Sequence, residues 1–450
     1  MEKSITKDLT VGSPFKLIIN FAFPIFLGIL FQQFYNVVDT MIVGRTLGVD
    51  ALASVGATGS IMFMILGFCN GVCSGFAIPI AQYFGAKDEH TMKKAIANSI
   101  WISVVFSIVI TTTVTFLCDD ILRLMDTPEN IIDLSYQYLI VIFMGIPVVI
   151  FYNMFSSIIR SLGDSKTPVF FLVLSSIINI GLDLLFIKVF HMGVAGAGYA
   201  TVTAQLFSVV LCIWYILKKF SFLKMSKLEK KPDIHIMIKL LSMGLPMGLQ
   251  YSITAIGSVV LQTAVNGLGS TIVAAMTAGG KISMFCCAPF DALGTTMATY
   301  GGQNVGAKRL DRVDDGMKKG ILIGCVYAIA AFLVLFFFGK YFALLFVNQG
   351  ETDIIHNISM LLICNSAFYI PLALVNIVRF MIQGMGFSAF AVIAGVFEMF
   401  ARAAFGFLLV PLFGFTAACF ASPVAWILAD VFLIPAYFYV KKKLDVKFSN

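Results

Sequence analysis

The stretch Gln82-Tyr-Phe-Gly-Ala-Lys87 recurs in the second half of the chain as Gln303-Asn-Val-Gly-Ala-Lys308. Each copy closes a long apolar run with the same glycine, alanine and lysine. Further residues match at nearly the same spacing: Pro24 with Pro246, Gly48 with Gly269, Gly163 with Gly386, and Gly193 with Gly414. The chain is therefore predicted to contain two repeats, one in each half.

The composition indicates that most of the surface around these repeats faces lipid. The 450 residues are 59% hydrophobic and 12% charged, whereas soluble domains have roughly 45–50% apolar and 25% charged residues. The longest polar stretch, about 218–239, is too short to fold as a separate domain. The sequence contains no Walker motif, nucleophile elbow or zinc motif, so we predict no enzymatic chemistry, no cofactor and no bound metal.

Twelve apolar runs reach the length of roughly 20 residues that is needed to cross a bilayer. They lie near 15–43, 52–81, 95–117, 134–159, 167–187, 194–217, 238–264, 272–300, 317–338, 356–382, 388–410 and 416–440. With alternate loops on opposite sides, 24 of the 31 Lys and Arg fall on the side of both termini. Both termini are therefore predicted to be cytoplasmic.

The net charge of +7 follows from this topology and does not indicate nucleic-acid binding. We predict an all-α integral membrane protein with twelve transmembrane helices in two pseudosymmetric six-helix lobes. The lobes cover residues 1–217 and 238–450, and the basic stretch 218–237 joins them as a cytoplasmic linker. Binding of anionic lipid is an alternative role for that linker.

Six spans in each half return the chain to its starting side, so the repeats are parallel and related by a pseudo-twofold axis along the membrane normal. This architecture favours a secondary transporter that works by alternating access, with a cavity between the halves. Channels and membrane enzymes can also arise by duplication, but they would need a pore-like filter or a catalytic cluster. The sequence shows neither.

Four features together resemble the multidrug and toxic compound extrusion (MATE) transporters over nearly the whole chain. They are the proline-containing first span ending Tyr35-Asn-Val-Val-Asp-Thr40, the paired Gln-x-x-Gly-Ala-Lys words, Arg160-Ser-Leu-Gly-Asp-Ser-Lys-Thr-Pro168, and Gly193-Val-Ala-Gly-Ala-Gly-Tyr-Ala-Thr201. The resemblance implies a two-lobed, twelve-helix antiporter that expels amphipathic, often cationic compounds while H+ or Na+ moves inward.

Eight ionisable residues lie inside the predicted spans, where a charge costs about 2.5–3.5 kcal/mol. The first half contributes Asp39 and Asp183 and no Lys or Arg. The second half contributes equal numbers of acids and bases: Asp291, Glu398, Asp430, Lys281, Arg379 and Arg402. Only the first half therefore carries acids that need a proton, a neutral hydrogen-bond partner or a transported cation.

Asp39 and Asp183 are expected to lie at a similar depth, in the outer half of the bilayer. Asn179 precedes Asp183 by one helical turn, and Thr201 and Thr203 enter from the same side on the sixth span. These polar groups could hold a protonated carboxyl or a desolvated ion, and burial favours the neutral form of the acids. In the alternative interpretation, Asp39 and Asp183 are structural acids bonded to the backbone or to headgroups.

The proton-coupled, DinF-like branch of the family implies the same site at Asp39, Asn179, Asp183 and Thr201, with Asn153 as a further member. Tyr35 either lines the cavity or packs between the helices. Pro24 is either a hinge that bends the first span as the site titrates or a fixed kink.

The second half departs from the sodium-coupled NorM-type pattern, because its first and fourth spans contain no acid. Lys281, Glu398 and Arg402 either form an inter-helix ion-pair network or contact substrate.

The sequence thus predicts an exporter of amphipathic organic cations, coupled to H+ or alternatively to Na+. It is expected to act as a monomer in the cytoplasmic membrane of a bacterium. The alternative is a lipid-linked oligosaccharide flippase of the same superfamily, which would be expected to place Lys or Arg in its central cavity. The acids of the first half argue against that alternative.

Overall fold

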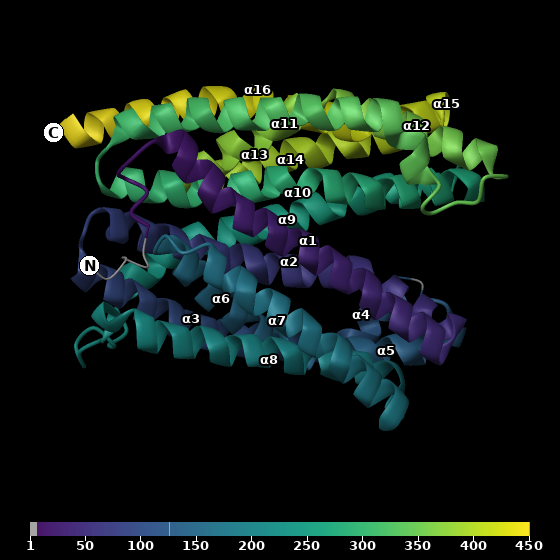
Figure 1. Ribbon diagram of the computed structural model, residues 1–450, viewed down its shortest axis with the longest axis horizontal. Coiled ribbons are helices and arrows are strands. Elements are labelled where there is room, and N and C mark those ends of the chain that lie inside the picture. Colours follow the sequence, from purple (N-terminus) through teal and green to yellow (C-terminus); the bar gives the residue numbers. More distant parts are fainter. Residues whose placement is uncertain (1–6, 126, 450) are drawn as a thin grey trace. The chain divides into compact units, whose positions relative to one another are not determined.

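The computed structural model describes residues 7–125 and 127–449, and the regular structure within these ranges is entirely helical (Figure 1). The first half contains α1 Pro14–Leu47, α2 Val49–Gly85, α3 Glu89–Phe116, α4 Cys118–Leu124, α5 Glu129–Met144, α6 Ile146–Ser161, α7 Lys166–Asp183, the π turn η1 Leu184–Val189, and α8 Gly193–Lys219. The short 3-10 turn η2 Ser221–Leu223 follows. The second half contains α9 Ile234–Asn266, α10 Ser270–Gly306, α11 Leu310–Ala343, α12 Thr352–Ala367, α13 Tyr369–Gly384, α14 Ala389–Ala404, the π turn η3 Phe405–Leu409, α15 Val410–Phe413, and α16 Phe415–Ser449.

The described helices provide twelve membrane spans, which confirms the predicted number. Ten are single helical segments that are long and apolar enough to cross a bilayer. The other two are bent pairs, α5 with α6 and α12 with α13, which qualify when each pair is taken as one span.

Both bends lie where the sequence predicts continuous spans, over 134–159 and 356–382. The angle is 46° between α5 and α6 and 51° between α12 and α13. Pro147 follows the first break and Pro371 follows the second. Because proline has no N–H and its ring clashes with the preceding turn, each helix begins anew there instead of continuing.

The helices form two compact units that are not continuous in sequence. Unit 1 comprises Leu27–Gly248 with the described part of Met1–Asp8, and unit 2 comprises Leu9–Phe26 with Leu249–Asn450. The boundaries fall shortly after Pro24 in α1 and shortly after Pro246 in α9. Each repeat thus contributes the start of its proline-containing first helix to the other unit.

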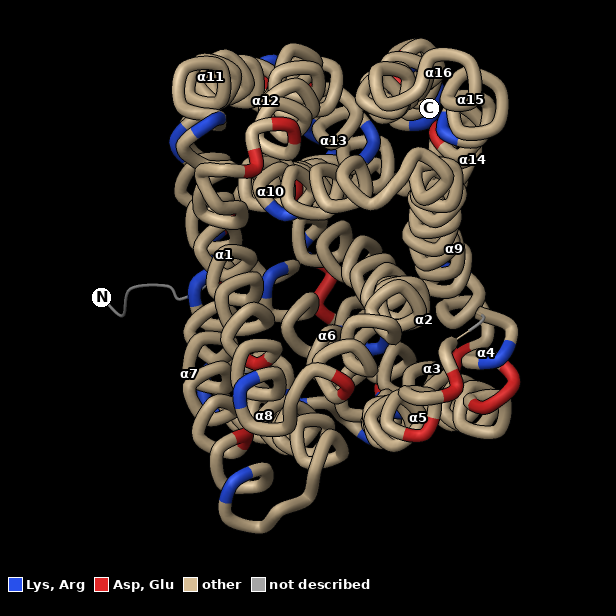
Figure 2. Tube along the Cα trace, turned by 90° about the vertical axis from the view of Figure 1, so that its right-hand side faces the viewer, with Lys and Arg blue, Asp and Glu red and all other residues tan. Residues whose placement is uncertain are grey.

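Each unit has two long helices against which its neighbours pack. In unit 1, α2 contacts α3, α5 and α6, and α8 contacts α5, α6 and α7. In unit 2, α10 contacts α11, α12 and α13, and α16 contacts α13 and α14 (Figure 2, which views the helices nearly end-on).

Glycines let the first part of α9 approach α2 closely within unit 1. A Cβ on Gly75 would lie 2.5 Å from the Cα of Gly244, and one on Gly71 would lie 2.6 Å from the carbonyl oxygen of Met247. Small residues allow such backbone contact between membrane helices, where packing and not hydrophobic burial drives association. The buried side chains of Val72, Phe76, Ile102 and Leu240 form a hydrophobic cluster in the same unit.

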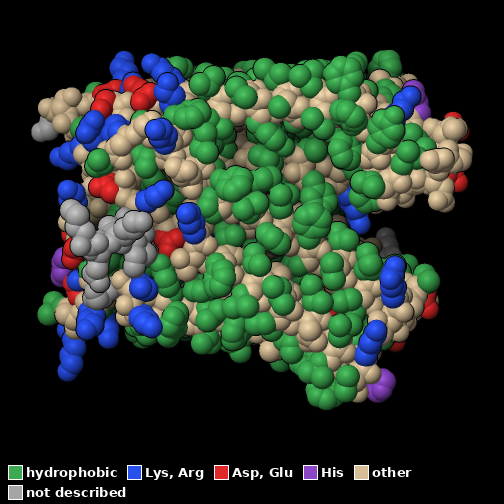
Figure 3. Space-filling view, in the orientation of Figure 1, with side chains coloured by type: hydrophobic (Ala, Val, Ile, Leu, Met, Phe, Trp, Pro, Cys, Tyr) green, Lys and Arg blue, Asp and Glu red, His purple; other side chains and the backbone are tan. Residues whose placement is uncertain are grey.

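Lys and Arg side chains gather at one end of the helices in each unit (Figure 3). In unit 2 this end holds Lys441, which pairs with Asp314, and Tyr437, whose hydroxyl donates to Asp314 at 2.9 Å. Such a one-sided distribution is what cytoplasmic termini require. The prediction for the termini also concerns residues 1–6 and Asn450, which lie outside the described residues.

Replacing Gly75 with alanine should destabilise unit 1, because the new methyl group would meet the α9 backbone. Overpacking of this kind costs about 1–3 kcal/mol. We expect a lower Tm for the variant purified in detergent. Gly59→Ala is the matched control, since Gly59 lies on the same helix and its Cβ would meet no atom within 4 Å. Equal Tm values for the two variants would contradict this packing.

Candidate functional site

Three helices of unit 1 bring most of the predicted site residues together. Tyr35 and Asp39 lie one turn apart on α1, and Asn179 and Asp183 lie one turn apart on α7. Residues four apart share one face of a helix, so each helix presents two polar groups to the same place. Helix α8, which packs along α7, adds Thr201.

The two acids are buried and adjacent. Asp39 is 7% exposed and Asp183 is fully buried. Their side chains are close enough to share a hydrogen bond, and the Oδ1 atom of each has no hydrogen-bond partner among the described residues. Two ionised carboxylates at this separation would repel each other strongly, so the pair needs a proton or a cation between them.

Asn179 connects this pair to α8. With its amide oriented to suit the surrounding donors and acceptors, Asn179 donates to Oδ2 of Asp183 at 3.3 Å. Its amide oxygen then accepts from the backbone N–H of Thr201 at 3.2 Å. The buried carboxyl of Asp183 is thus held by a neutral donor, and no Lys or Arg takes part in this contact.

Two tyrosines complete the surroundings of the acids. Tyr35 lies within electrostatic reach of both acids, and its hydroxyl is close enough to Thr201 for a hydrogen bond. Tyr138 on α5 is buried within electrostatic reach of Asp39, Tyr35 and Asp183. We did not predict Tyr138 from the sequence. The available signal was a tyrosine in an apolar span, since a buried hydroxyl usually finds a polar partner.

A π turn begins directly after Asp183. The turn η1 replaces the regular hydrogen bonding of α7 from Leu184 onward, and η3 does the same after α14 in unit 2. Such π segments often occur at functional sites. Because both repeats have one, however, the π turn belongs to the shared architecture, and only the side chains beside it distinguish the two units.

Three further predicted residues form none of the contacts described above among the described residues. Asn153 lies on α6, and its amide donates to the carbonyl oxygen of Val149 in its own helix at 2.9 Å. Thr203 is exposed on α8, because two residues along a helix turn the side chain by roughly 200° away from Thr201. Pro24 lies in the part of α1 that belongs to unit 2.

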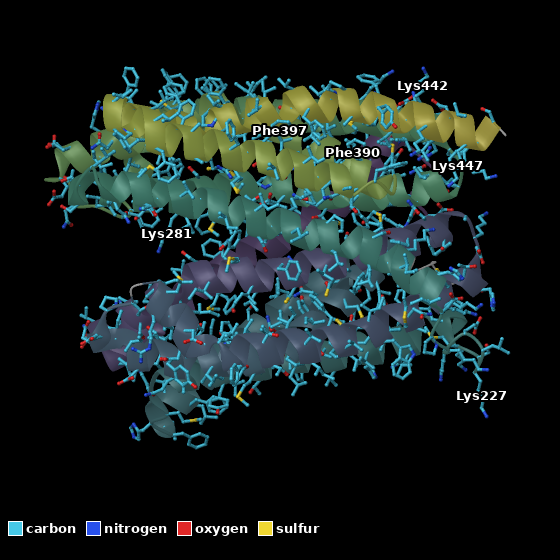
Figure 4. The ribbon with its side chains drawn as sticks, turned by 180° about the vertical axis from the view of Figure 1, so that it is seen from behind. Lys227, Lys281, Phe390, Phe397, Lys442 and Lys447 are labelled. Atoms are coloured by element: carbon cyan, nitrogen blue, oxygen red, sulfur yellow. The ribbon has the colours of Figure 1, made fainter. Side chains whose placement is uncertain are left out.

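In unit 2, Glu398 on α14 contacts two arginines. Its carboxylate pairs with Arg379 of α13 and, at 3.4 Å, with Arg402 one turn along its own helix. Lys281 is exposed on α10, forms no ion pair among the described residues, and projects away from α13 and α14 (Figure 4). The structure therefore brings Glu398 and Arg402 together, with Arg379 and not Lys281 as the third member.

No group of three His, Cys, Asp or Glu side chains in the described ranges could hold a metal ion. The chemistry available in unit 1 is that of two adjacent carboxyls with amide and hydroxyl neighbours. Such a group can bind and release a proton or a small cation, and it offers no nucleophile activated by a base.

Comparison with known proteins relates the chain to one family. The family model MatE matches residues 24–185 and matches again at residues 246–408. The first match begins at Pro24 and the second at Pro246, the two prolines that the repeat pairs with each other. One model thus describes both halves of the chain, which confirms the predicted repeat.

Individual proteins are also similar to this chain over most of its length. The probable multidrug resistance protein YpnP of Bacillus subtilis (strain 168) is 31% identical over 348 residues, covering 76% of this chain and 77% of that protein. The probable multidrug resistance protein YoeA of the same organism is 28% identical over 358 residues, covering 78% and 77%. A solved outward-facing multidrug resistance MATE family transporter of the MOP superfamily has the same fold, with a TM-score of 0.90, 22% identity and 99% coverage of each chain.

Replacing Asn179 with alanine should leave the buried Asp183 carboxyl without its amide donor. Loss of a partner for a buried polar group costs about 1–3 kcal/mol. Because the amide donor favours the ionised carboxyl, the loss of stability should grow as the pH is raised. The measurement is Tm in detergent across a pH series. Asn153→Ala is the control, and a loss of the same size and pH dependence in both variants would argue against the contact.

Proposed function

Because the chain belongs to the MatE family, whose members are transporters and not enzymes, we propose that it exports amphipathic, often cationic organic compounds in exchange for H+. The exchange proceeds by alternating access, with the ion bound at the carboxyls of unit 1. Multidrug resistance proteins among the relatives support the substrate class. The DinF-like, proton-coupled branch is the part of the family to which we assign the chain.

The observation that carries this proposal is the adjacent pair Asp39 and Asp183. Both acids are buried, their side chains are close enough to share a hydrogen bond, and neither forms an ion pair with Lys or Arg in the described part of the chain. An uncompensated pair of this kind is stable only with a bound proton or cation. Binding of the ion therefore changes the charge of the site, which is what coupling to transport requires.

A proton fits the surroundings better than Na+ does. The two carboxyls are close enough to share a hydrogen bond, and such a bond needs a proton on one of them. In the proposed cycle a proton from the outside neutralises the pair, and substrate leaves to the outside. Release of the proton to the cytoplasm then restores the negative charge that attracts the next organic cation.

Helix α1 links the site to a point where bending is possible. Pro24 removes a backbone hydrogen bond several helical turns before Asp39, close to the place where α1 passes from unit 2 to unit 1. In the cycle proposed here Pro24 acts as the hinge of α1, and the alternative is a fixed kink.

We assign the protein to the cytoplasmic membrane of a bacterium, as a multi-pass protein that works as a monomer. The similar multidrug resistance proteins are bacterial, and the twelve spans of one chain already supply both halves of the repeat. The remaining partners are the organic substrate and the lipid bilayer.

An anionic substrate, as in a lipid-linked oligosaccharide flippase, would need buried cations that are free to bind it. Arg379 and Arg402 are the buried arginines in the described spans, and both contact Glu398. This pairing leaves the drug exporter as the better supported function.

Export of a fluorescent organic cation from everted vesicles tests the coupling ion directly. With pH and Na+ gradients imposed separately, we expect the pH gradient to drive export and the Na+ gradient to have little effect. If neither gradient drives export, the antiporter proposal is wrong. Export driven by Na+ alone would replace H+ with Na+ as the coupling ion.

Replacing Asp39 with asparagine should abolish coupling, because the pair can then no longer alternate between a charged and a neutral state. In proteoliposomes we expect substrate-driven proton flux to fall at least about tenfold, equivalent to roughly 1.4 kcal/mol or more. Asp50→Asn is the control, since Asp50 is exposed in the first turn of α2. Undiminished coupling in Asp39→Asn would rule out the proposed site.

A further inference from the structure

The basic linker between the repeats is fixed to unit 1 by apolar contacts. Phe220 and Leu223 are buried, with 2% and 7% of their surface exposed, and belong to the main hydrophobic cluster of that unit. The ring centroid of Phe220 lies 5.5 Å from that of Tyr215, which stands one turn before the end of α8. The start of the linker therefore packs against the helices like part of their core, although its composition is basic.

Hydrogen bonds fix the rest of the linker to α3. The indole N–H of Trp101 donates to the carbonyl oxygen of Lys230 at 3.0 Å. The backbone N–H of Asp233 donates to Oδ1 of the buried Asn98 at 2.8 Å. Because Asn98 and Trp101 are one turn apart on α3, the linker follows one face of that helix.

The charges of the linker are arranged so that its positive groups face outward. Glu229, the one acid in residues 214–232, is buried, accepts from the backbone N–H of Ser226 at 2.6 Å and lies 3.2 Å from Nδ1 of His90. Four linker lysines are exposed and form no ion pair among the described residues: Lys224, Lys227, Lys230 and Lys231. The linker thus presents positive charge that no acid of its own neutralises.

Two exposed tryptophans place this charge at the border of the lipid-facing surface. Trp214 lies on α8 and Trp101 on α3, each near the end of the helix that adjoins the linker. Exposed apolar side chains continue the same helix faces: Leu206, Val210 and Leu217 on α8, and Val105 and Ile108 on α3. Tryptophan is enriched where membrane helices meet the headgroups. The two rings therefore indicate the headgroup level on the side of the linker.

Lysine side chains lie beside these tryptophans. Nζ of Lys218 is 4.8 Å from the centroid of the Trp214 ring, one turn along α8. Lys227 projects sideways from the ends of the helices instead of along their axes (Figure 4). Lipid surrounds the helices on their sides, so a lysine that extends sideways at this level meets headgroups. Anionic headgroups attract such lysines.

The topology of the chain does not by itself require this arrangement. The bias of Lys and Arg toward the cytoplasmic side depends on how many lie near the spans, and not on where their side chains point. In this linker the backbone is fixed, the acid is engaged and the lysines border exposed apolar rows. A fixed set of charges loses less conformational freedom on binding, which favours affinity.

We propose that the linker and the adjoining ends of α3 and α8 form a binding site for an anionic phospholipid. The exposed linker lysines and Lys218 bind the negatively charged headgroup, and the acyl chains lie along the apolar rows of the two helices. Trp101 and Trp214 stand between the two parts of the lipid. All of these residues belong to unit 1, and the site does not depend on the transport function proposed above.

Quenching of tryptophan fluorescence by brominated lipid tests this site in the full-length protein. The chain has three tryptophans, so in a Trp426→Phe parent variant the signal comes from Trp101 and Trp214. The protein is reconstituted in phosphatidylcholine bilayers with increasing amounts of brominated phosphatidylglycerol. We expect phosphatidylglycerol to be preferred at least about fivefold, the factor that roughly one lysine near an anionic surface supplies. The preference should fall as salt is raised.

Removal of the linker charges should abolish this preference. In the parent we combine Lys224→Gln, Lys227→Gln, Lys230→Gln and Lys231→Gln, and expect the two lipids to bind about equally. The same four positions changed to arginine keep the charge and should keep the preference. The matched control removes four exposed lysines of unit 2 through Lys318→Gln, Lys442→Gln, Lys443→Gln and Lys447→Gln. It should leave the preference unchanged.

Equal binding of the two lipids by the parent would overturn the proposal, as would an unchanged preference in the linker glutamine variant. An equal loss in the unit 2 control would also overturn it, because the preference would then follow net charge and not this site. If the variant with four glutamines does not fold, Lys227→Gln with Lys230→Gln replaces it. That pair should give an intermediate preference, and a preference equal to the parent's would reject the site.

Discussion

The cost of a charge in lipid is the constraint on which the rest of this structure depends. Water cannot solvate an ionised side chain within the spans, so each buried charge needs a partner from another helix or from solution. Unit 1 brings two acids to each other and surrounds them with an amide and hydroxyls. Unit 2 places two arginines on one glutamate. The two units therefore accommodate their buried charges in different ways, and they are chemically distinct although they share one fold.

The repeat shows how little backbone change this difference requires. The sequence separation between Asn179 and Arg402 is the same as that between the matched glycines Gly163 and Gly386. Asn179 and Arg402 therefore occupy equivalent positions in the two repeats. Asp39 is separated from Leu261 by the same number of residues as Pro24 from Pro246, so Leu261 is its equivalent in the second repeat. The same helix face thus presents an acid in one unit and an apolar group in the other. In unit 2 the buried acids Glu398 and Asp430 are equal in number to the buried arginines Arg379 and Arg402, whereas the two buried acids of the site in unit 1 have no such partner among the described residues.

Glycine and proline determine where the helices meet and bend. The α2–α9 contact depends on the absence of side chains at Gly71 and Gly75, while Pro147 and Pro371 divide two spans. Pro24 and Pro246 stand where α1 and α9 pass from one unit to the other. A helix shared in this way belongs to both units, so any change in its bend affects the side chains on either part. The hinge role proposed for Pro24 rests on this continuity of α1 between the proline and Asp39.

The sequence by itself determined the twelve spans, the repeat and the side chains one turn apart on the same helix, such as Asn179 with Asp183 and Glu398 with Arg402. These features depend on hydropathy, spacing and helical periodicity, which are local. Only the tertiary structure decided that Arg379 contacts Glu398, that Tyr138 lies beside the acids, and that Lys281 turns away. Partner choice depends on how each helix is rotated about its axis, and the packing of neighbouring helices sets that rotation.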